Sequence, residues 1–141
     1  DGRGLELEAV WDVNRQWRLS GNYSFQHAEN GVTQRRAPNS PAHHVYARGD
    51  WRFSPGWSLH PQLNWVSERA RSASDPRGPL AGYATVDLTG RVQPVDSHWQ
   101  WALSVRNLTD SDAREPSPDM SLPNDFPLPG RSVVLQATYQ F

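Results

Sequence analysis

The sequence predicts an all-β protein whose antiparallel strands follow one another up and down. Three observations lead to this fold class. Apolar and polar residues alternate with a period of two in segment after segment, the connections between segments alternate between short and long, and aromatic residues gather beside the short connections. Because successive side chains of a strand point to opposite faces, the alternation gives each strand an apolar face and a polar face.

The composition excludes several other classes. The chain has 141 residues, 36% of them hydrophobic, and a formal net charge of −1, so we expect no electrostatic attraction to nucleic acid. It has no cysteine, which excludes a disulfide framework, a thiolate metal site and a cysteine nucleophile. No run of about 18 apolar residues occurs, so we expect no spanning helix, and we expect any export signal upstream of residue 1.

The first two predicted strands, residues 5–13 and 17–26, carry their apolar side chains at odd-numbered positions. Leu5 and Leu7 begin the apolar face of the first strand, and every even-numbered residue of the second is polar. Residues 14–16 form the short turn between them.

The third and fourth strands, residues 44–53 and 57–65, show the same pattern. Odd-numbered positions again carry the apolar side chains, Trp51 and Trp65 among them. The connection Ser54-Pro55-Gly56 consists of residue types that favour a tight turn.

The last three strands are residues 84–92, 99–106 and 132–141. The first of them carries apolar residues at even positions, and the other two carry them at odd positions. A short connection, residues 93–98, joins the first two. The remaining connections are long and polar, and comprise about residues 27–42, 67–82 and 109–130.

Strands of about ten residues with short turns at one end and long loops at the other are typical of transmembrane β-barrels. The alternative is a small binding module with a soluble β-sandwich, whose strands also alternate because their apolar faces cover a second sheet. The aromatic residues favour the barrel, since Trp and Tyr prefer the membrane interface and form girdles along barrel rims. Those beside the short turns and at the chain end are Trp11, Trp17, Trp51, Phe53, Trp57, Trp99, Tyr139 and Phe141. Those expected at the opposite rim are Tyr23, Phe25 and Trp65.

Counting strand directions predicts that the chain is part of a larger barrel. With the short turns in the periplasm, Phe141 lies at the periplasmic rim and Asp1 at the external rim. Bacterial single-chain barrels have even strand numbers with both termini inside, so about seven strands require further strands before residue 1. Unpaired backbone groups at an edge facing lipid cost several kcal/mol each, and we therefore expect that the isolated chain cannot close as a monomeric barrel.

Three stretches near the end of the chain resemble TonB-dependent outer-membrane receptors. Residues 101–110 resemble the family's penultimate strand with its Asn-Leu-(Thr/Phe)-Asp end, which falls on Asn107, Leu108 and Asp110. Residues 127–132 resemble the Pro-Gly-Arg start of the last strand, at Pro129, Gly130 and Arg131, and residues 138–141 resemble the terminal aromatic segment. Residues 21–25, 41–44 and 82–88 agree, so the resemblance covers nearly the whole chain in the family's order.

The resemblance implies a fold, a location and partners. It implies an outer-membrane barrel of about 22 strands around an N-terminal plug, with residues 1–141 as the C-terminal portion of the barrel and the plug and earlier strands absent. The implied partners are outer-membrane lipid, the rest of the barrel and its plug, the TonB complex acting through the missing plug, the barrel-assembly machinery and a small-molecule metal chelate. The implied function is uptake of an iron complex such as a siderophore, with cobalamin or haem as alternatives within the family.

The motif residues also have a physical interpretation. Gly130 would let the chain leave the long loop without a Cβ clash, and Arg131 would pair with a carboxylate. Asn107 and Asp110 would accept hydrogen bonds from backbone N–H groups where the preceding strand ends. The closing aromatics, Tyr139 and Phe141, are expected to be the signal that the assembly machinery reads, or else simply members of the girdle.

Arginines are the candidate ligand-binding residues, because guanidinium groups bind carboxylates and catecholates bidentately. The external-loop set comprises Arg35, Arg36, Arg69, Arg71 and Arg77. The set that faces the lumen by alternation comprises Arg18, Arg48, Arg52, Arg91 and Arg106. In the alternative interpretation the lumen set pairs with the plug and with acidic residues of the chain, namely Glu6, Glu8, Asp50 and Asp87.

We expect no catalytic residue, no metal site and no cofactor. His43 and His44 are adjacent on a strand and point to opposite faces, so they cannot share a metal. Residues 96–98 read Asp-Ser-His, but neighbours in a tight turn cannot form a triad. A barrel enzyme such as a lipase would need a serine, a histidine and a carboxylate meeting on adjacent strands, which the alternation is not expected to supply. The acidic residues of the last loop are expected to be solvated: Asp112, Glu115, Asp119 and Asp125.

Overall fold

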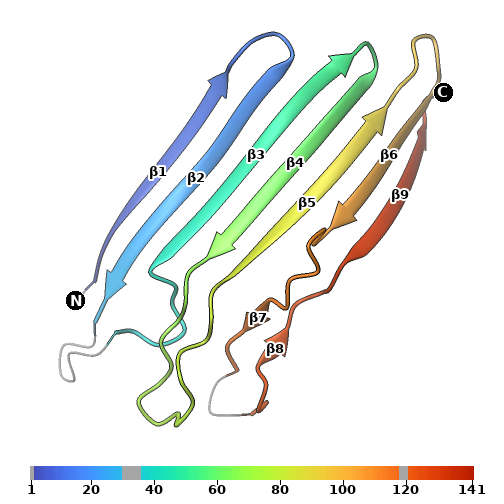
Figure 1. Cartoon of the computed structure of the whole chain (residues 1–141). Helices are drawn as coiled ribbons and strands as arrows, with labels where there is room; N and C mark the ends of the chain where they lie inside the picture. Colours follow the sequence, from blue (N-terminus) through green and yellow to red (C-terminus); the bar gives the residue numbers. More distant parts are fainter. Residues whose placement is uncertain (1, 30–35, 118–120) are drawn as a thin grey trace.

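The computed structural model describes residues 2–29, 36–117 and 121–141, and in them seven long strands form one antiparallel sheet (Figure 1). The strands are β1 (Gly2–Asp12), β2 (Trp17–Ala28), β3 (His43–Ser54), β4 (Trp57–Val66), β5 (Tyr83–Val92), β6 (Trp99–Arg106) and β9 (Ser132–Tyr139). Each pairs with its neighbours in the order β1-β2-β3-β4-β5-β6-β9. The seven predicted strands are thus confirmed.

The long loop before β9 contains a small hairpin that the alternation does not predict. Its strands, β7 (Arg114–Glu115) and β8 (Phe126–Pro127), pair with each other and form a separate two-stranded sheet. Two-residue strands are too short to show an alternating pattern, so the sequence predicts an irregular loop for this segment.

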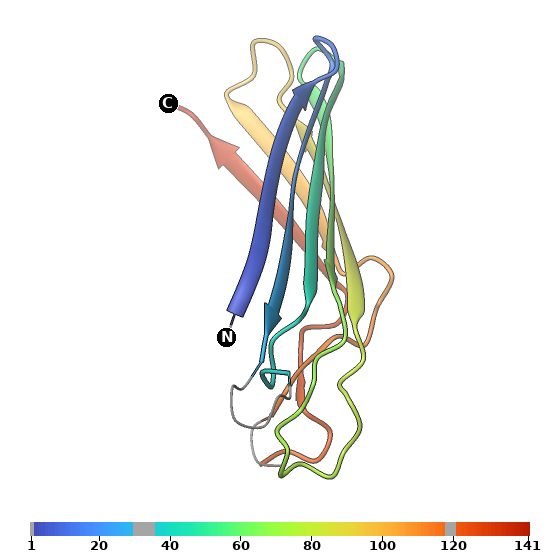
Figure 2. The same cartoon turned by 90° about the vertical axis from the view of Figure 1, so that its left-hand side faces the viewer.

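The sheet is a single twisted layer (Figure 2). Among the described residues, the buried hydrophobic side chains are only Val66, Leu80 and Ala113. Large apolar side chains of the sheet remain exposed, including Leu135 at 67% and Leu103 at 50%. A soluble β-sandwich would cover these side chains with a second sheet, and the described residues contain none on this face.

The strand register joins the apolar faces of all seven strands into one surface. Leu7 is opposite Tyr23 and Leu103 is opposite Leu135, so odd positions meet odd positions there. At β4 and β5 the register sets Leu63 opposite Val86, which explains why β5 alone carries its apolar residues at even positions. The predicted division of the strands into an apolar face and a polar face is confirmed.

The turns sort by length as predicted, with short ones at one end of the sheet and long loops at the other (Figure 1). The first short turn is closed by Asn14, whose Oδ1 accepts hydrogen bonds from the backbone N–H groups of Gln16 and Trp17 at 2.8 and 2.9 Å. In the second turn Gly56 has a φ of 74°, and a Cβ there would lie 2.1 Å from the carbonyl oxygen of Gln93. Only glycine fits this close approach between two turns.

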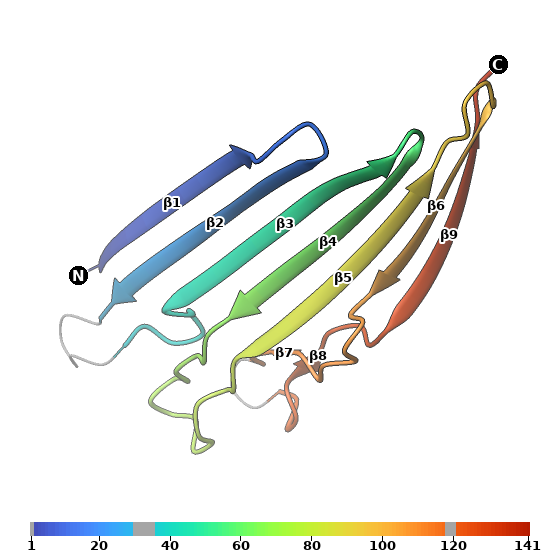
Figure 3. The same ribbon diagram turned by 45° about the horizontal axis from the view of Figure 1, so that its top comes forward.

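The sheet is open, with β1 at one edge and β9 at the other (Figure 3). The start of β1 lies at the long-loop end, and the end of β9 lies at the short-turn end (Figure 1). Within the described segments, no helix has the length and apolar character needed to cross a bilayer.

Candidate functional site

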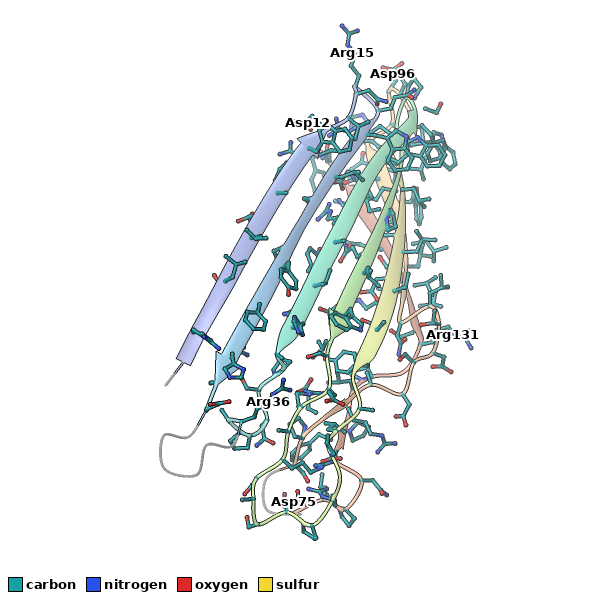
Figure 4. All side chains as sticks on the ribbon, turned by 60° about the vertical axis from the view of Figure 1, so that its left-hand side comes forward. Asp12, Arg15, Arg36, Asp75, Asp96 and Arg131 are labelled. Atoms are coloured by element: carbon teal, nitrogen blue, oxygen red, sulfur yellow. The ribbon has the colours of Figure 1, made fainter. Side chains whose placement is uncertain are left out.

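The aromatic residues at the short-turn end form two groups of ring contacts. In the first, Trp17 stacks on Trp51 at 5.0 Å, and Phe53 lies between Trp51 and Trp57 at 5.2 and 6.3 Å. In the second, Tyr139 lies 5.0 Å from Trp99 and 5.2 Å from Phe141. We call these residues the aromatic girdle. They lie beside the turns that carry Arg15 and Asp96, at the opposite end from Arg36 and Asp75 (Figure 4).

The predicted motif around Asn107 forms a turn at the end of β6 that is hydrogen-bonded to β5. Asn107 is 4% exposed and has a φ of 47°. Its backbone N–H donates to Asp87 Oδ1 at 2.8 Å, and its side-chain oxygen accepts from the N–H of Ser111 at 2.9 Å. The next residue, Leu108, donates its N–H to the carbonyl oxygen of Val86 at 2.7 Å. The turn therefore ties the end of β6 to β5.

Asp110 connects this turn to the start of β9. Its Oδ1 accepts the backbone N–H of Arg131 at 2.8 Å, and its Oδ2 lies 3.9 Å from the Arg131 guanidinium. The Pro129 carbonyl accepts from the Asn107 side chain at 3.4 Å. A Cβ at Gly130 would lie 3.2 Å from Asp110 Oδ1, a tight contact that agrees with the expectation that glycine avoids a Cβ clash here.

Arg69, one of the predicted ligand arginines, is buried between loop segments. It is 2% exposed, forms an ion pair with Glu115 and donates to the Arg114 carbonyl at 2.5 Å. Its guanidinium carbon lies 5.5 Å from the ring centre of Tyr83, whose hydroxyl donates to Glu115 at 3.0 Å. Arg69 thus attaches the loop after β4 to the β7–β8 hairpin.

Arg71 and Arg77 meet at one carboxylate, that of Asp125. Arg71 binds it through both terminal nitrogens at 2.8 and 2.7 Å, and Arg77 Nη1 adds a contact at 3.2 Å. Arg77 also donates to both carboxylate oxygens of Asp75, the shortest contact being 2.6 Å. We call these four residues the loop clamp. Asp125 is only 6% exposed, so the expectation that its charge is solvated is wrong. The Asp75 side chain is covered to a similar degree.

The loop clamp is ionised throughout the neutral range. Hydrogen bonds from Arg71 hold the pKa of Asp125 well below its usual range, and those from Arg77 lower the pKa of Asp75 from 3.8 to about 2. A carboxylate with a lowered pKa stabilises the fold above its ordinary pKa, and this stabilisation is lost as the pH falls through the lowered value. The contribution of Asp75 is therefore complete above a pH of about 4.

The other two predicted loop arginines are placed differently. Arg36 is exposed and lies in an isolated bridge opposite Glu29 (Figure 4), and Arg35 lies outside the described residues, as does Asp119. The structure thus brings Arg71 and Arg77 together, puts Arg69 in a neighbouring contact and leaves Arg36 apart. Contact of these arginines with a ligand stays a prediction.

The polar face of the sheet holds a pocket of about 660 Å³ at the short-turn end, which we call the polar-face pocket. Residues lining it include Gln16, Arg52, Ser58, His60, Arg91, Gln93 and Gln100. Of the four acidic partners expected for the lumen arginines, Asp50 binds Arg48 at 2.8 Å. Arg18 lies 3.7 Å from Asp12 instead, and Asp87 accepts a backbone N–H.

A serine, a histidine and a carboxylate do meet on adjacent strands, so the expectation that alternation would keep them apart is wrong. His60 Nδ1 lies 2.5 Å from Asp50 Oδ1, and His60 Nε2 lies 2.9 Å from Ser58 Oγ. All three positions are even-numbered and share the polar face of β3 and β4, which the alternation itself could have indicated. Asp50 also accepts from Arg48, so a chain of hydrogen bonds from Arg48 through Asp50 holds His60 in place on the pocket wall.

His43 and His44 point to opposite faces, as predicted. Tyr23 OH is 2.7 Å from His43 Nδ1, and Asn64 Oδ1 is 2.6 Å from His44 Nε2. In the described ranges, no group of three or more His, Asp or Glu side chains is arranged to hold a metal ion.

The comparison with known proteins agrees with this geometry. The family model described as TonB dependent receptor-like, beta-barrel matches residues 2–108. The metal-pseudopaline receptor CntO of Pseudomonas aeruginosa is 34% identical, and the match covers 77% of this chain and 16% of that receptor. The chain therefore spans about a sixth of the length of the curated relatives that it matches.

Two solved structures resemble the sheet closely. The ferric-catecholate import receptor Fiu from E. coli K12 has a TM-score of 0.81 at 18% identity, covering 99% of this chain and 21% of that one. The ferric yersiniabactin uptake receptor FyuA from Yersinia pestis has a TM-score of 0.77 at 21% identity, covering 99% and 23%. At these sequence identities the similarity shows only that the folds agree: the sheet of this chain matches part of the larger barrel of each receptor.

Proposed function

The chain belongs to the TonB-dependent receptor-like β-barrel family, and from this premise we propose that it forms the C-terminal portion of a receptor barrel that takes up a metal chelate. Members of the family are bacterial outer-membrane proteins, and they are transporters rather than enzymes. We further propose where this segment lies in the barrel, what its partners are and which class of ligand the receptor binds.

The place in the barrel is supported by the two faces and two edges of the sheet. The apolar face, with Leu103 and Leu135 exposed, suits outer-membrane lipid. The unpaired sides of β1 and β9 suit further strands of the same barrel, because lipid cannot satisfy their backbone groups. The polar face suits a plug, through which the TonB complex would act, and the aromatics Tyr139 and Phe141 suit the barrel-assembly machinery.

A metal chelate is the ligand class that the observations favour. The 34% identical relative is a metal-pseudopaline receptor, and two structural neighbours import ferric chelates. Arg36 is exposed at the long-loop end and would offer a cationic contact to an anionic chelate, such as an iron–siderophore complex, whereas Arg69, Arg71 and Arg77 are already engaged in ion pairs.

The observation that carries the proposal is the exposed, continuous apolar face on a sheet of this family. The test is uptake by cells that lack their own receptors and express the parent receptor, meaning the receptor that contains this chain. We expect uptake of radiolabelled metal from at least one chelate in a panel of ferric siderophores, metal-pseudopaline, haem and cobalamin, and its loss when TonB is deleted. Uptake that continues unchanged without TonB would refute the proposal.

A further inference from the structure

The polar-face pocket contains two arginines that have no acidic partner among the described residues. The ion pairs of the described ranges engage other arginines: Arg18, Arg48, Arg69, Arg71, Arg77, Arg114 and Arg131. Arg52 and Arg91 take part in none of them, yet both line the same pocket. Both arginines are exposed, and since no described carboxylate neutralises them, their guanidinium groups are available to an anion in this hollow.

The remaining lining of the pocket combines hydrogen-bonding side chains with the apolar residues Phe53, Pro55 and Trp57. Its residues include no aspartate and no glutamate. Gln16, Gln93 and Gln100 contribute side-chain amides, and Ser58 lies directly opposite Arg91 in the pairing of β4 with β5. Amide and hydroxyl donors beside two guanidinium groups match the oxygens of a carboxylate.

The walls of the pocket are held in place from two sides. His60 is fixed by Asp50 on one side and Ser58 on the other, at 2.5 and 2.9 Å. At the rim, the N–H of Gln93 donates to the Gly56 carbonyl at 2.8 Å, which joins the turn after β3 to the end of β5. A preformed wall lowers the entropy cost of binding a small anion.

We propose that the polar-face pocket is a binding site for the carboxylate groups of a small-molecule chelate, with Arg52 and Arg91 as the anion-binding residues. This inference rests on the proposed function and adds a second binding site for the ligand, on the polar face of the barrel wall. The pocket lies at the short-turn end, so a chelate that enters between the long loops meets it only after it has crossed most of the polar face.

The test uses the purified parent receptor in detergent with citrate as the probe and its uncharged triethyl ester as the reference compound. Titration calorimetry compares the receptor with the double variant Arg52→Gln/Arg91→Gln. We expect the double variant to bind citrate at least tenfold more weakly, and the ester to bind to neither protein. The variant Arg52→Lys/Arg91→Lys keeps the charge without the planar fork, and it should retain an intermediate affinity.

Arg106→Gln is the matched control, because Arg106 lies at a polar-face position of β6, takes part in no described ion pair and does not line the pocket. It should leave citrate binding within twofold of the parent. Equal citrate binding by the parent and the double variant would overturn the inference, and so would a receptor that binds no citrate, since a segment of the receptor itself would then fill the pocket.

Uptake measurements separate this inference from the proposed function. If uptake depends on TonB but the double variant binds citrate as tightly as the parent, the pocket is not the carboxylate site. The proposed transport function would then be unaffected. Should the glutamine variant fail to assemble, the lysine variant and the single variants give the same comparison.

Discussion

At the scale of single residues, Asp125 stabilises two loops although it lies in a proline-rich loop itself. Its carboxylate accepts hydrogen bonds from Arg71 and Arg77, which lie 54 and 48 residues earlier in the sequence, and its Oδ1 also accepts the N–H of Ser117 at 3.1 Å. One carboxylate therefore joins the loop after β4 to the loop before β9. No spacing rule connects residues this far apart, so the sequence could place the arginines in loops but could not pair them.

Asp125→Asn is expected to loosen both loops without affecting the sheet. The change removes the charge that Arg71 and Arg77 share and leaves their donors unsatisfied, which costs on the order of 1–3 kcal/mol. Hydrogen exchange in the parent receptor should show faster exchange in residues 67–82 and unchanged exchange in β4.

The control is Asp112→Asn, which removes the exposed partner of Arg114, with the Asp112 side chain 72% exposed. Exposed ion pairs contribute about 0–1 kcal/mol, so this variant should exchange like the parent. If both variants behave alike, the loop clamp has no special role.

The polar-face trio of Asp50, Ser58 and His60 shows a different limit of prediction from sequence. Alternation places all three on one face, but it does not say which residues of β3 lie opposite which residues of β4. That register depends on the irregularity between Trp51 and Ser54, which the sequence does not reveal. The contact of His60 with Asp50 was missed for this reason.

At the scale of elements, the seven long strands could be predicted because each is long enough to show its alternation. The observed bounds of β1 to β5 extend the predicted ones at the loop ends, as in β1, which begins at Gly2, whereas those of β6 coincide and β9 ends earlier, at Tyr139. The hairpin of β7 and β8 could not be predicted, since its position depends on the contact of Glu115 with Arg69 and Tyr83. Short elements of this kind are set by tertiary contacts rather than by local pattern.

Gly56→Ala is expected to disrupt the turn between β3 and β4. The new Cβ would meet a backbone oxygen at 2.1 Å and would sit in a left-handed conformation. These two effects together cost about 2–5 kcal/mol. The fraction of folded barrel, measured by the gel mobility of unheated parent receptor, should fall.

Gly78→Ala provides the comparison for this turn. A Cβ at Gly78 meets nothing within 4 Å, so the folded fraction should stay unchanged. A similar loss in both variants would show that the close approach at Gly56 is not what limits folding.

At the scale of the whole molecule, the sheet has two faces of opposite character and almost no interior. The two faces could be predicted from alternation together with the aromatic girdle. The pocket on the polar face could not, because it depends on where the turns at Gly56 and Gln93 meet.

The contrast between the faces gives a sharp prediction at neighbouring positions of β9. Leu135→Arg puts a charge on the lipid side near the middle of the strand, at a cost of about 2–4 kcal/mol, whereas Gln136→Arg faces the polar side and should be mild. The amount of assembled parent receptor in outer-membrane fractions measures both. Equal assembly of the two variants would contradict the assignment of faces.

The pairing of apolar positions from β1 to β9, which shifts between Trp51 and Ser54, also constrains how such a gene can change in length. Deleting one codon inside a strand would invert the orientation of every side chain beyond it, relative to the neighbouring strand. Frame-preserving insertions and deletions should therefore accumulate in the long loops, and those that survive within strands should come in pairs of codons or be accompanied by a bulge like the one before Ser54.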